Sequence, residues 1–167
     1  YEYQIEAELI YHFVQNGLRA VAYPSIVAGG KNACTLHYTE NAARLENGDL
    51  LLIDAGAECD HYAADITRTY SAQDDLFAEL IGALNRVQLA SIAEIKVGMR
   101  YTDLHLQMHA KIAQVLLDFK LAQGSVESLV AGGVTATFFP HGLGHLLGLQ
   151  VHDVAGFMQD DRGTPLA

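Results

Sequence analysis

The chain has 167 residues, half of them hydrophobic and 18% charged, which is the size and composition of one globular domain and excludes a disordered or low-complexity chain. Twenty acidic residues against ten basic ones give a net charge of −10, which repels phosphate backbones and anionic lipid surfaces, so no nucleic-acid or membrane partner is expected. No apolar run reaches the ~20 residues of a membrane helix. The two cysteines show no zinc spacing, and we expect a cytoplasmic protein.

The first 73 residues carry mainly strand signals. Apolar residues at three- and four-residue steps predict a helix from the first residue to Gly17. Residues 18–27 and 33–38 are short and β-leaning on either side of a glycine-rich turn, which predicts an antiparallel pair. The unbroken apolar run 50–53, followed by Asp54, and the alternating run 64–70 predict a hairpin over 50–70.

From residue 74 the apolar residues recur with a helical period. Two helices are predicted, over 76–95 and from residue 102 to 119, with Gly98 and Gly124 near their ends. Residues 125–139 are ambiguous, Pro140 and the glycines that follow disfavour a regular helix, and 151–153 are expected to be extended. Strands followed by helices, without internal repeats or linkers, predict a single α+β domain over 1–167.

Two aspartates stand where a charge needs a partner. Asp54 directly follows four aliphatic residues, and Asp65 lies eleven positions further on. A hairpin can bring both carboxylates to one end of a sheet, where a divalent cation would compensate their charge. The alternative is structural: Asp54 begins a turn, while Asp65 pairs with Arg68 or caps a neighbour.

A glycine-rich tract carries three histidines within twelve residues: His141, His145 and His152. The first two have the i, i+4 spacing of a zinc-binding helix, but the glutamate of that motif is absent and glycines stand between them, so backbone shape must position these rings. Alternatively, they form hydrogen bonds at a half-buried surface. His105 and His109 flank an apolar stripe and are interpreted as part of a solvated helix face.

Other catalytic motifs are missing. The sequence has no G-x-S-x-G elbow for a serine nucleophile, and Gly29-Gly30-Lys31 lacks the rest of a phosphate-binding loop. Serine catalysis and nucleotide binding therefore have no support in the sequence.

Four linked motifs together resemble the prolidase and aminopeptidase P family of metallopeptidases. They are the tracts LHYTEN at 36–41, DAG at 54–56, YAADITRT at 62–69 and HGLGHLLGLQVHDVAGFMQDD at 141–161. The last tract is most similar to bacterial Xaa-Pro dipeptidases. The resemblance implies the pita-bread fold, an α+β arrangement with an antiparallel sheet flanked by helices.

The resemblance also implies a site and an activity. Asp54, Asp65 and His145 match metal ligands, with Asp65 bridging two divalent ions, for which manganese is expected and cobalt or zinc are alternatives. His37, His141 and His152 match catalytic histidines that orient the substrate and stabilise the tetrahedral intermediate. The implied reaction is hydrolysis of the imide bond of an Xaa-Pro dipeptide by a metal-bridging hydroxide, in a homodimeric enzyme.

Parts of the family pattern are missing from the chain. The resemblance implies two further glutamate ligands later in the family domain, one in a strand and one near the C-terminus. Glu127 is the last glutamate of this chain and precedes the histidine tract. We therefore expect a truncated catalytic domain, without the N-terminal domain and C-terminal strands, that binds metal weakly. The alternatives are an Xaa-Pro aminopeptidase acting on longer peptides, a metal-free pita-bread module that binds peptides, and creatinase-like hydrolysis without metal.

Overall fold

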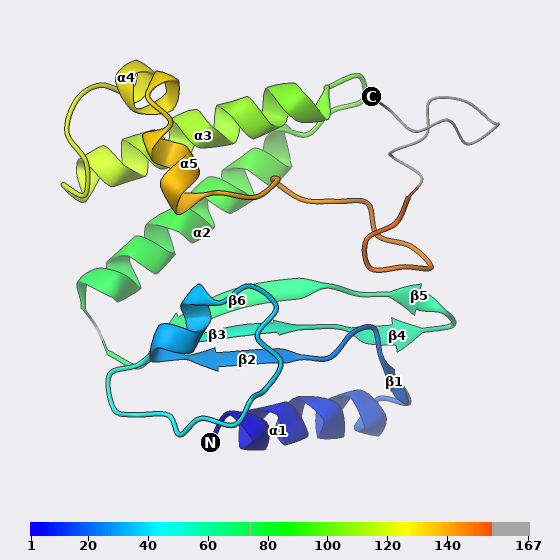
Figure 1. Ribbon diagram of the computed structural model, residues 1–167. Coiled ribbons are helices and arrows are strands. Elements are labelled where there is room, and N and C mark those ends of the chain that lie inside the picture. The colour runs from blue at the N-terminus through cyan, green and yellow to red at the C-terminus, as the bar shows by residue number, and fades with distance from the viewer. Residues whose placement is uncertain (74, 155–167) are drawn as a thin grey trace. The chain divides into compact units, whose positions relative to one another are not determined.

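The computed structural model describes residues 1–73 and 75–154, which form two compact units (Figure 1). The first unit comprises Tyr1–Gln73 together with the segment that begins at His145, and the second comprises residues 74–144. Both strands and helices are present, as expected for the α+β class. The single catalytic domain over residues 1–167 stays a prediction.

The first unit is built on an antiparallel sheet with the order β2-β3-β6: β2 is Ile26–Gly29, β3 is Leu50–Ala55 and β6 is Ile66–Ser71. Asp54 of β3 stands opposite Ile26 on one side and Thr67 on the other. The predicted hairpin over 50–70 is therefore confirmed. Three short strands form a second sheet in the order β1-β4-β5: Ala20–Val21, Ala57–Cys59 and Tyr62–Ala63.

Helix α1, Glu2–Gln15, packs against β2 and confirms the helix predicted at the start of the chain (Figure 1). The antiparallel pair predicted from 18–27 and 33–38 is wrong. Gly30–Cys34 forms a 3₁₀ helix, η1, and residues 35–46 contain no strand. Instead, the Asn41 side chain accepts a hydrogen bond from Val27 N and donates one to Ser25 O, so it satisfies backbone groups that a neighbouring strand would otherwise pair.

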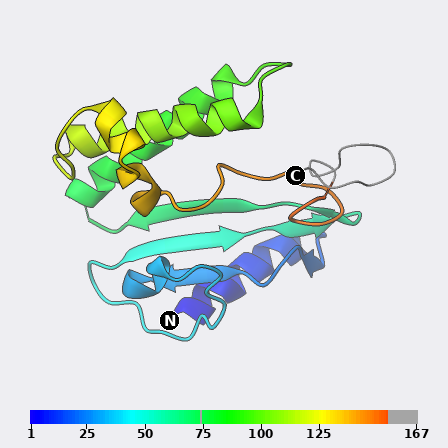
Figure 2. The same ribbon diagram turned by 45° about the horizontal axis from the view of Figure 1, so that its top comes forward.

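The second unit is helical: α2 is Leu76–Glu94, α3 is Tyr101–Asp118, α4 is Val126–Ala131 and α5 is Val134–Phe138. The two long helices confirm the sequence prediction, and α3 runs back alongside α2 (Figures 1 and 2). The Asp75 carboxylate caps α2 by accepting from Phe77 N and Ala78 N. The stripe on α3 forms the core with residues of neighbouring segments: Met108, Ile112, Leu116, Val87, Ala122, Phe139 and Leu143.

Helix α2 is long and apolar enough to cross a membrane by length and composition alone, the one helix of which this holds within the described residues. A single such helix is weak evidence for a membrane span. The last turn of α2 carries Glu94, whose carboxylate binds the ammonium group of Lys111 in α3 at 2.5 Å.

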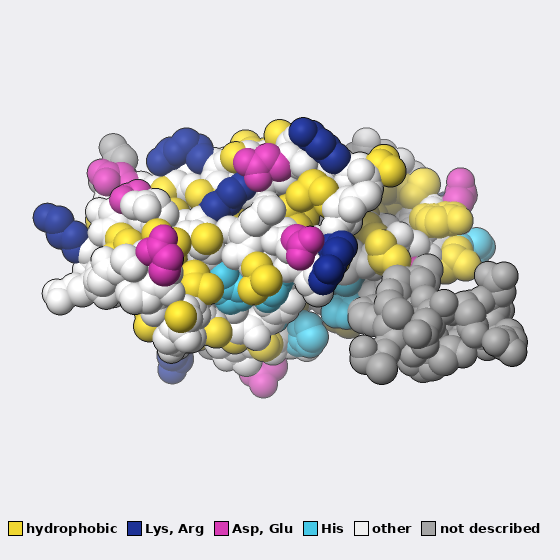
Figure 3. Space-filling model, turned by 90° about the horizontal axis from the view of Figure 1, so that it is seen from above, with side chains coloured by type: hydrophobic (Ala, Val, Ile, Leu, Met, Phe, Trp, Pro, Cys, Tyr) yellow, Lys and Arg dark blue, Asp and Glu magenta, His cyan; other side chains and the backbone are white. Residues whose placement is uncertain are grey.

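Several apolar side chains on α2 and α3 are exposed: Leu76, Phe77, Leu89, Ile92 and Leu106. On the face shown in Figure 3, hydrophobic side chains lie scattered between charged ones.

Candidate active site

The two aspartates come together because the chain folds tightly between them. Asp54 lies in β3 and Asp65 directly precedes β6. Between them, a Cβ atom at Gly56 would lie 1.7 Å from the carbonyl oxygen of Ala64. No side chain fits there, so glycine allows the backbone before Asp65 to approach the end of β3.

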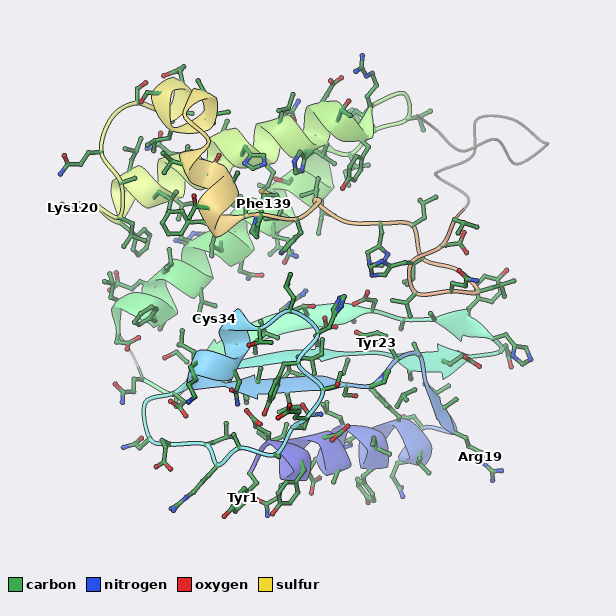
Figure 4. The ribbon with its side chains drawn as sticks, in the orientation of Figure 1. Tyr1, Arg19, Tyr23, Cys34, Lys120 and Phe139 are labelled. Atoms are coloured by element: carbon green, nitrogen blue, oxygen red, sulfur yellow. The ribbon has the colours of Figure 1, made fainter. Side chains whose placement is uncertain are left out.

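A tyrosine hydroxyl lies between the two carboxylates. Tyr23, labelled in Figure 4 where the chain passes from β1 to β2, donates to Asp54 Oδ1 and lies 3.0 Å from Asp65 Oδ1. Burial and the two neighbouring carboxylates raise the pKa of the Tyr23 hydroxyl above its ordinary value. The phenol therefore keeps its proton and holds both carboxylates near one point. Sequence reasoning missed Tyr23, because a tyrosine before a proline carries no catalytic signature.

His145 approaches Asp65 from the other side. Its Nε2 lies 3.1 Å from Asp65 Oδ2, and its Nδ1 lies 2.9 Å from the carbonyl oxygen of Leu146. Since a carbonyl only accepts, Nδ1 carries the hydrogen and Nε2 faces the carboxylate. The His152 ring stacks on the His145 ring with centroids 4.1 Å apart. Asp65, His145 and His152 thus form one continuous group.

A cavity of about 360 Å³ opens beside this group. Four predicted site residues line it, His37, Asp54, Asp65 and His152, together with Tyr23. The other lining residues are mostly apolar: Pro24, Ile26, Thr39 and Val151. Apolar walls with a few convergent polar groups are typical of a site for a small organic ligand, and the volume lies within the usual range for such sites.

His37 reaches this cavity from an irregular segment. Its backbone is in the left-handed region, with φ of 52°, and Asn41 is in the same region with φ of 46°. Non-glycine residues adopt this region infrequently, so the surrounding contacts must hold them there. His141 belongs to the second unit, where its ring packs edge-on against Phe139. Its predicted role with the other histidines stays a prediction.

The segment from His145 to Val154 is folded back on itself without regular structure. Asp153 N donates to Leu146 O, Gly148 N to Gln150 O, and Ala63 N of β5 to Gly148 O. Val151 and His152 lie in bends and Asp153 has no regular structure, so the extended conformation expected for 151–153 is wrong. Residues 155–161, which also belong to the resembling tract, lie outside the described residues.

The solvated helix face predicted for His105 and His109 is wrong. His109 is buried, with Nδ1 2.9 Å from Thr135 Oγ1 and Nε2 3.1 Å from His105 Nε2. The His105 ring lies against Phe139 with its Nδ1 buried. Both histidines flank the apolar stripe of α3. Helix α5 and the residue after it, Phe139, cover them, so the buried surface extends beyond that stripe.

The donors at this site suit a divalent ion. Carboxylates and imidazole are ligands of manganese and zinc, and His145 Nε2 lies 3.1 Å from Asp65 Oδ2. Within residues 1–73 and 75–154, no group of three or more His, Cys, Asp or Glu side chains converges as a complete metal site. Ligation by Asp54, Asp65 and His145 therefore stays a prediction, although the residue chemistry fits it.

Paired aspartates, an adjacent histidine and a cavity with apolar walls are features typical of metal-dependent hydrolases. The chain belongs to metallopeptidase family M24, whose family model matches residues 1–167. It is similar to an Xaa-Pro dipeptidase of Shewanella frigidimarina, with 52% identity over 99% of this chain and 38% of that protein. An Xaa-Pro dipeptidase of Shewanella baltica is 55% identical over 88% of this chain and 34% of that protein.

The fold is that of solved peptidases of this kind. Zinc-substituted Escherichia coli aminopeptidase P, in complex with product, matches all of this chain and 38% of its own with a TM-score of 0.88 and 35% identity. Proline aminopeptidase P II from Yersinia pestis matches all of this chain and 39% of its own with a TM-score of 0.83 and 38% identity. The predicted pita-bread fold is confirmed, and the chain spans about 38% of the length of the relatives it matches.

Proposed function

We propose that this chain is part of the catalytic domain of an Xaa-Pro dipeptidase, which hydrolyses the imide bond of Xaa-Pro dipeptides with the help of divalent metal. The observation that carries the proposal is the convergence of Tyr23, Asp54, Asp65 and His145 beside a cavity with apolar walls. The similarity to Xaa-Pro dipeptidases over nearly the whole chain supports the substrate class.

Asp54, Asp65 and His145 would hold the metal, which we expect to be a pair of manganese ions with cobalt or zinc as alternatives. When bound, such ions polarise a carbonyl group and lower the pKa of water toward ~7. Tyr23 orients both carboxylates toward one point. The hydrogen bond from His145 Nδ1 to Leu146 O orients the ring so that its Nε2 lies beside Asp65 Oδ2.

His37 and His152 act on the substrate. Both line the cavity that Asp54 and Asp65 border, where their ring N–H groups can donate to the scissile carbonyl as its oxygen gains negative charge. His141 is proposed to assist in the same way. Pro24, Ile26 and Val151 provide apolar surface for a proline ring and exclude water from it. The imide nitrogen of an Xaa-Pro bond carries no hydrogen, so the site cannot bind that nitrogen through an N–H hydrogen bond. The shape of the cavity must therefore recognise the proline ring.

The test is release of free proline from an Xaa-Pro dipeptide by the protein that contains this chain. Release should require added manganese and stop after chelation. Proline release that survives thorough chelation would contradict a metal-dependent dipeptidase. A tripeptide with the same first two residues separates the alternative: an Xaa-Pro aminopeptidase cleaves it readily, whereas a dipeptidase strongly prefers the dipeptide.

The cellular setting is also part of the proposal. We expect a cytoplasmic homodimer that binds short peptides and neither nucleic acid nor membranes. The net charge of −10 and two free cysteines, Cys34 and Cys59, support this setting. Sedimentation of the purified protein tests the dimer, since a single species of monomer mass would contradict it.

A further inference from the structure

Glu2 is an acidic side chain buried in the first unit away from the cavity. It has no exposed surface, yet its carboxylate accepts four hydrogen bonds. Oε1 accepts from Gly29 N at 2.8 Å and Asn32 Nδ2 at 3.0 Å; Oε2 accepts from Tyr38 O–H at 2.7 Å and Ala43 N at 2.8 Å. A buried charge with this many donors joins the segments that supply them.

Those donors include both sides of the segment that carries His37. Tyr38 directly follows His37, and its hydroxyl also accepts from Asn32 Nδ2 at 3.1 Å. Further along the chain, Ala43 binds the carboxylate through its N–H, and its carbonyl oxygen accepts from Glu2 N at 3.0 Å. Between them, Asn41 anchors the segment to the backbone before and within β2. Asn32 precedes His37 and Tyr38 follows it, so donors on both sides of the left-handed residue bind Glu2.

We propose that Glu2 is a positioning residue: through the hydroxyl of Tyr38 it fixes the backbone at His37 and so directs the imidazole into the cavity. Glu2 does not line the cavity, so its effect on catalysis passes through His37. The catalytic part of this inference rests on the proposed function. The structural part, that the Glu2–Tyr38 hydrogen bond sets the environment of the His37 ring, does not.

The structural part is tested by NMR of the histidine rings in the protein that contains this chain. The His37 signal is assigned by its loss in His37→Ala. Tyr38→Phe removes one hydroxyl and leaves three donors on Glu2, so the protein should stay folded while the His37 signal shifts or broadens. Tyr11→Phe, at an exposed tyrosine, should leave the signal unchanged. An unchanged His37 signal in Tyr38→Phe would overturn the inference.

The catalytic part is tested by a double-mutant cycle on kcat/KM for an Xaa-Pro dipeptide. Tyr38→Phe alone should lower kcat/KM on the order of tenfold, since it removes a hydrogen bond to a charged group. In the His37→Ala background, the same change should have less than about a twofold effect, because nothing is left to position. Equal losses in both backgrounds would contradict action through His37. If His37→Ala itself leaves activity intact, the proposed role of His37 fails, while the NMR result still decides the structural part.

Discussion

In the first unit, hydrogen bonds from neighbouring groups hold individual charged and polar side chains in place. Tyr23 places a hydroxyl between two carboxylates, and Glu2 receives donors from three different segments. Burial alone would raise the pKa of Glu2, but its hydrogen bonds outweigh this effect and lower the pKa. Removing the polar group of Tyr23 or of Glu2 should therefore have a measurable effect.

Replacing Glu2 with glutamine should destabilise the protein in a pH-dependent way. One carboxylate oxygen becomes an NH₂ group that faces existing donors, which costs about 2–4 kcal/mol at neutral pH. Because folding lowers the pKa of Glu2 from 4.5, its contribution to stability is complete above pH 4.5 and is lost as the pH falls further. Urea unfolding of both proteins at pH 7 and pH 3 measures this difference, which should shrink at the lower pH. A difference equally large at both values would contradict it, and Glu8→Gln, on the exposed side of α1, is the control.

Replacing Tyr23 with phenylalanine should weaken metal binding. Without the hydroxyl, neither carboxylate is oriented toward the other, and loss of such a supporting contact lowers metal affinity by about 10- to 100-fold. Calorimetric titration with manganese measures the affinity. Tyr62→Phe, at a tyrosine of β5 that is 61% exposed, should bind as the unmodified protein does. Equal affinities for all three proteins would show that the phenol has no part in the metal site.

At the scale of elements, the hairpin between β3 and β6 brings Asp54 to Asp65. This geometry depends on close contact between backbone segments at Gly56. The four apolar residues before Asp54 and the alternation after Asp65 allowed the hairpin to be predicted. The mistaken strand over 33–38 has a local cause, since the Asn41 side chain replaces the neighbour that β2 would otherwise need.

Gly56→Ala should disrupt the site while leaving most of the fold intact. The added methyl group would lie 1.7 Å from the Ala64 carbonyl oxygen, so the backbone before Asp65 must move away. We expect a loss of about 3 kcal/mol in the free energy of unfolding and a larger fractional loss of metal affinity. Gly82→Ala, in α2 where a Cβ contacts only the end of the Arg86 side chain, is the control. A Gly56→Ala protein with unchanged affinity would contradict the account.

In the second unit, the histidine pair on α3 should make stability depend on pH. Burial, followed by the proximity of His105, lowers the pKa of His109 below 6.5. The unfolded chain therefore takes up a proton at a higher pH than the folded one, and stability falls as the pH drops through 6.5. His109→Asn should show a smaller decrease between pH 7.5 and 5.5 in urea unfolding. His61→Asn, with a side chain that is 90% exposed, should behave as the unmodified protein.

At the scale of the whole molecule, the sequence was sufficient to predict the first helix, the hairpin of β3 and β6 and the two long helices. It also singled out four residues that line the cavity: His37, Asp54, Asp65 and His152. The long amphipathic helices have a clear period, and Asp54, Asp65 and the histidine tract have residue types that few structural roles require. Tyr23 and Glu2 could not be predicted, because their partners lie 27 to 42 positions away in the chain. The burial of His109 depended on α5, in a stretch where the sequence signal was ambiguous.

The most direct test of the account is restoration of proline release by manganese after chelation, with Asp65→Asn compared with the unmodified protein. Asp60→Asn is the matched control, since it makes the same change in an exposed turn whose left-handed backbone asparagine tolerates. Manganese should restore release in the unmodified protein and in Asp60→Asn, and should fail to do so in Asp65→Asn at the same concentration. Full restoration in Asp65→Asn would contradict the claim that these carboxylates hold the metal on which hydrolysis depends.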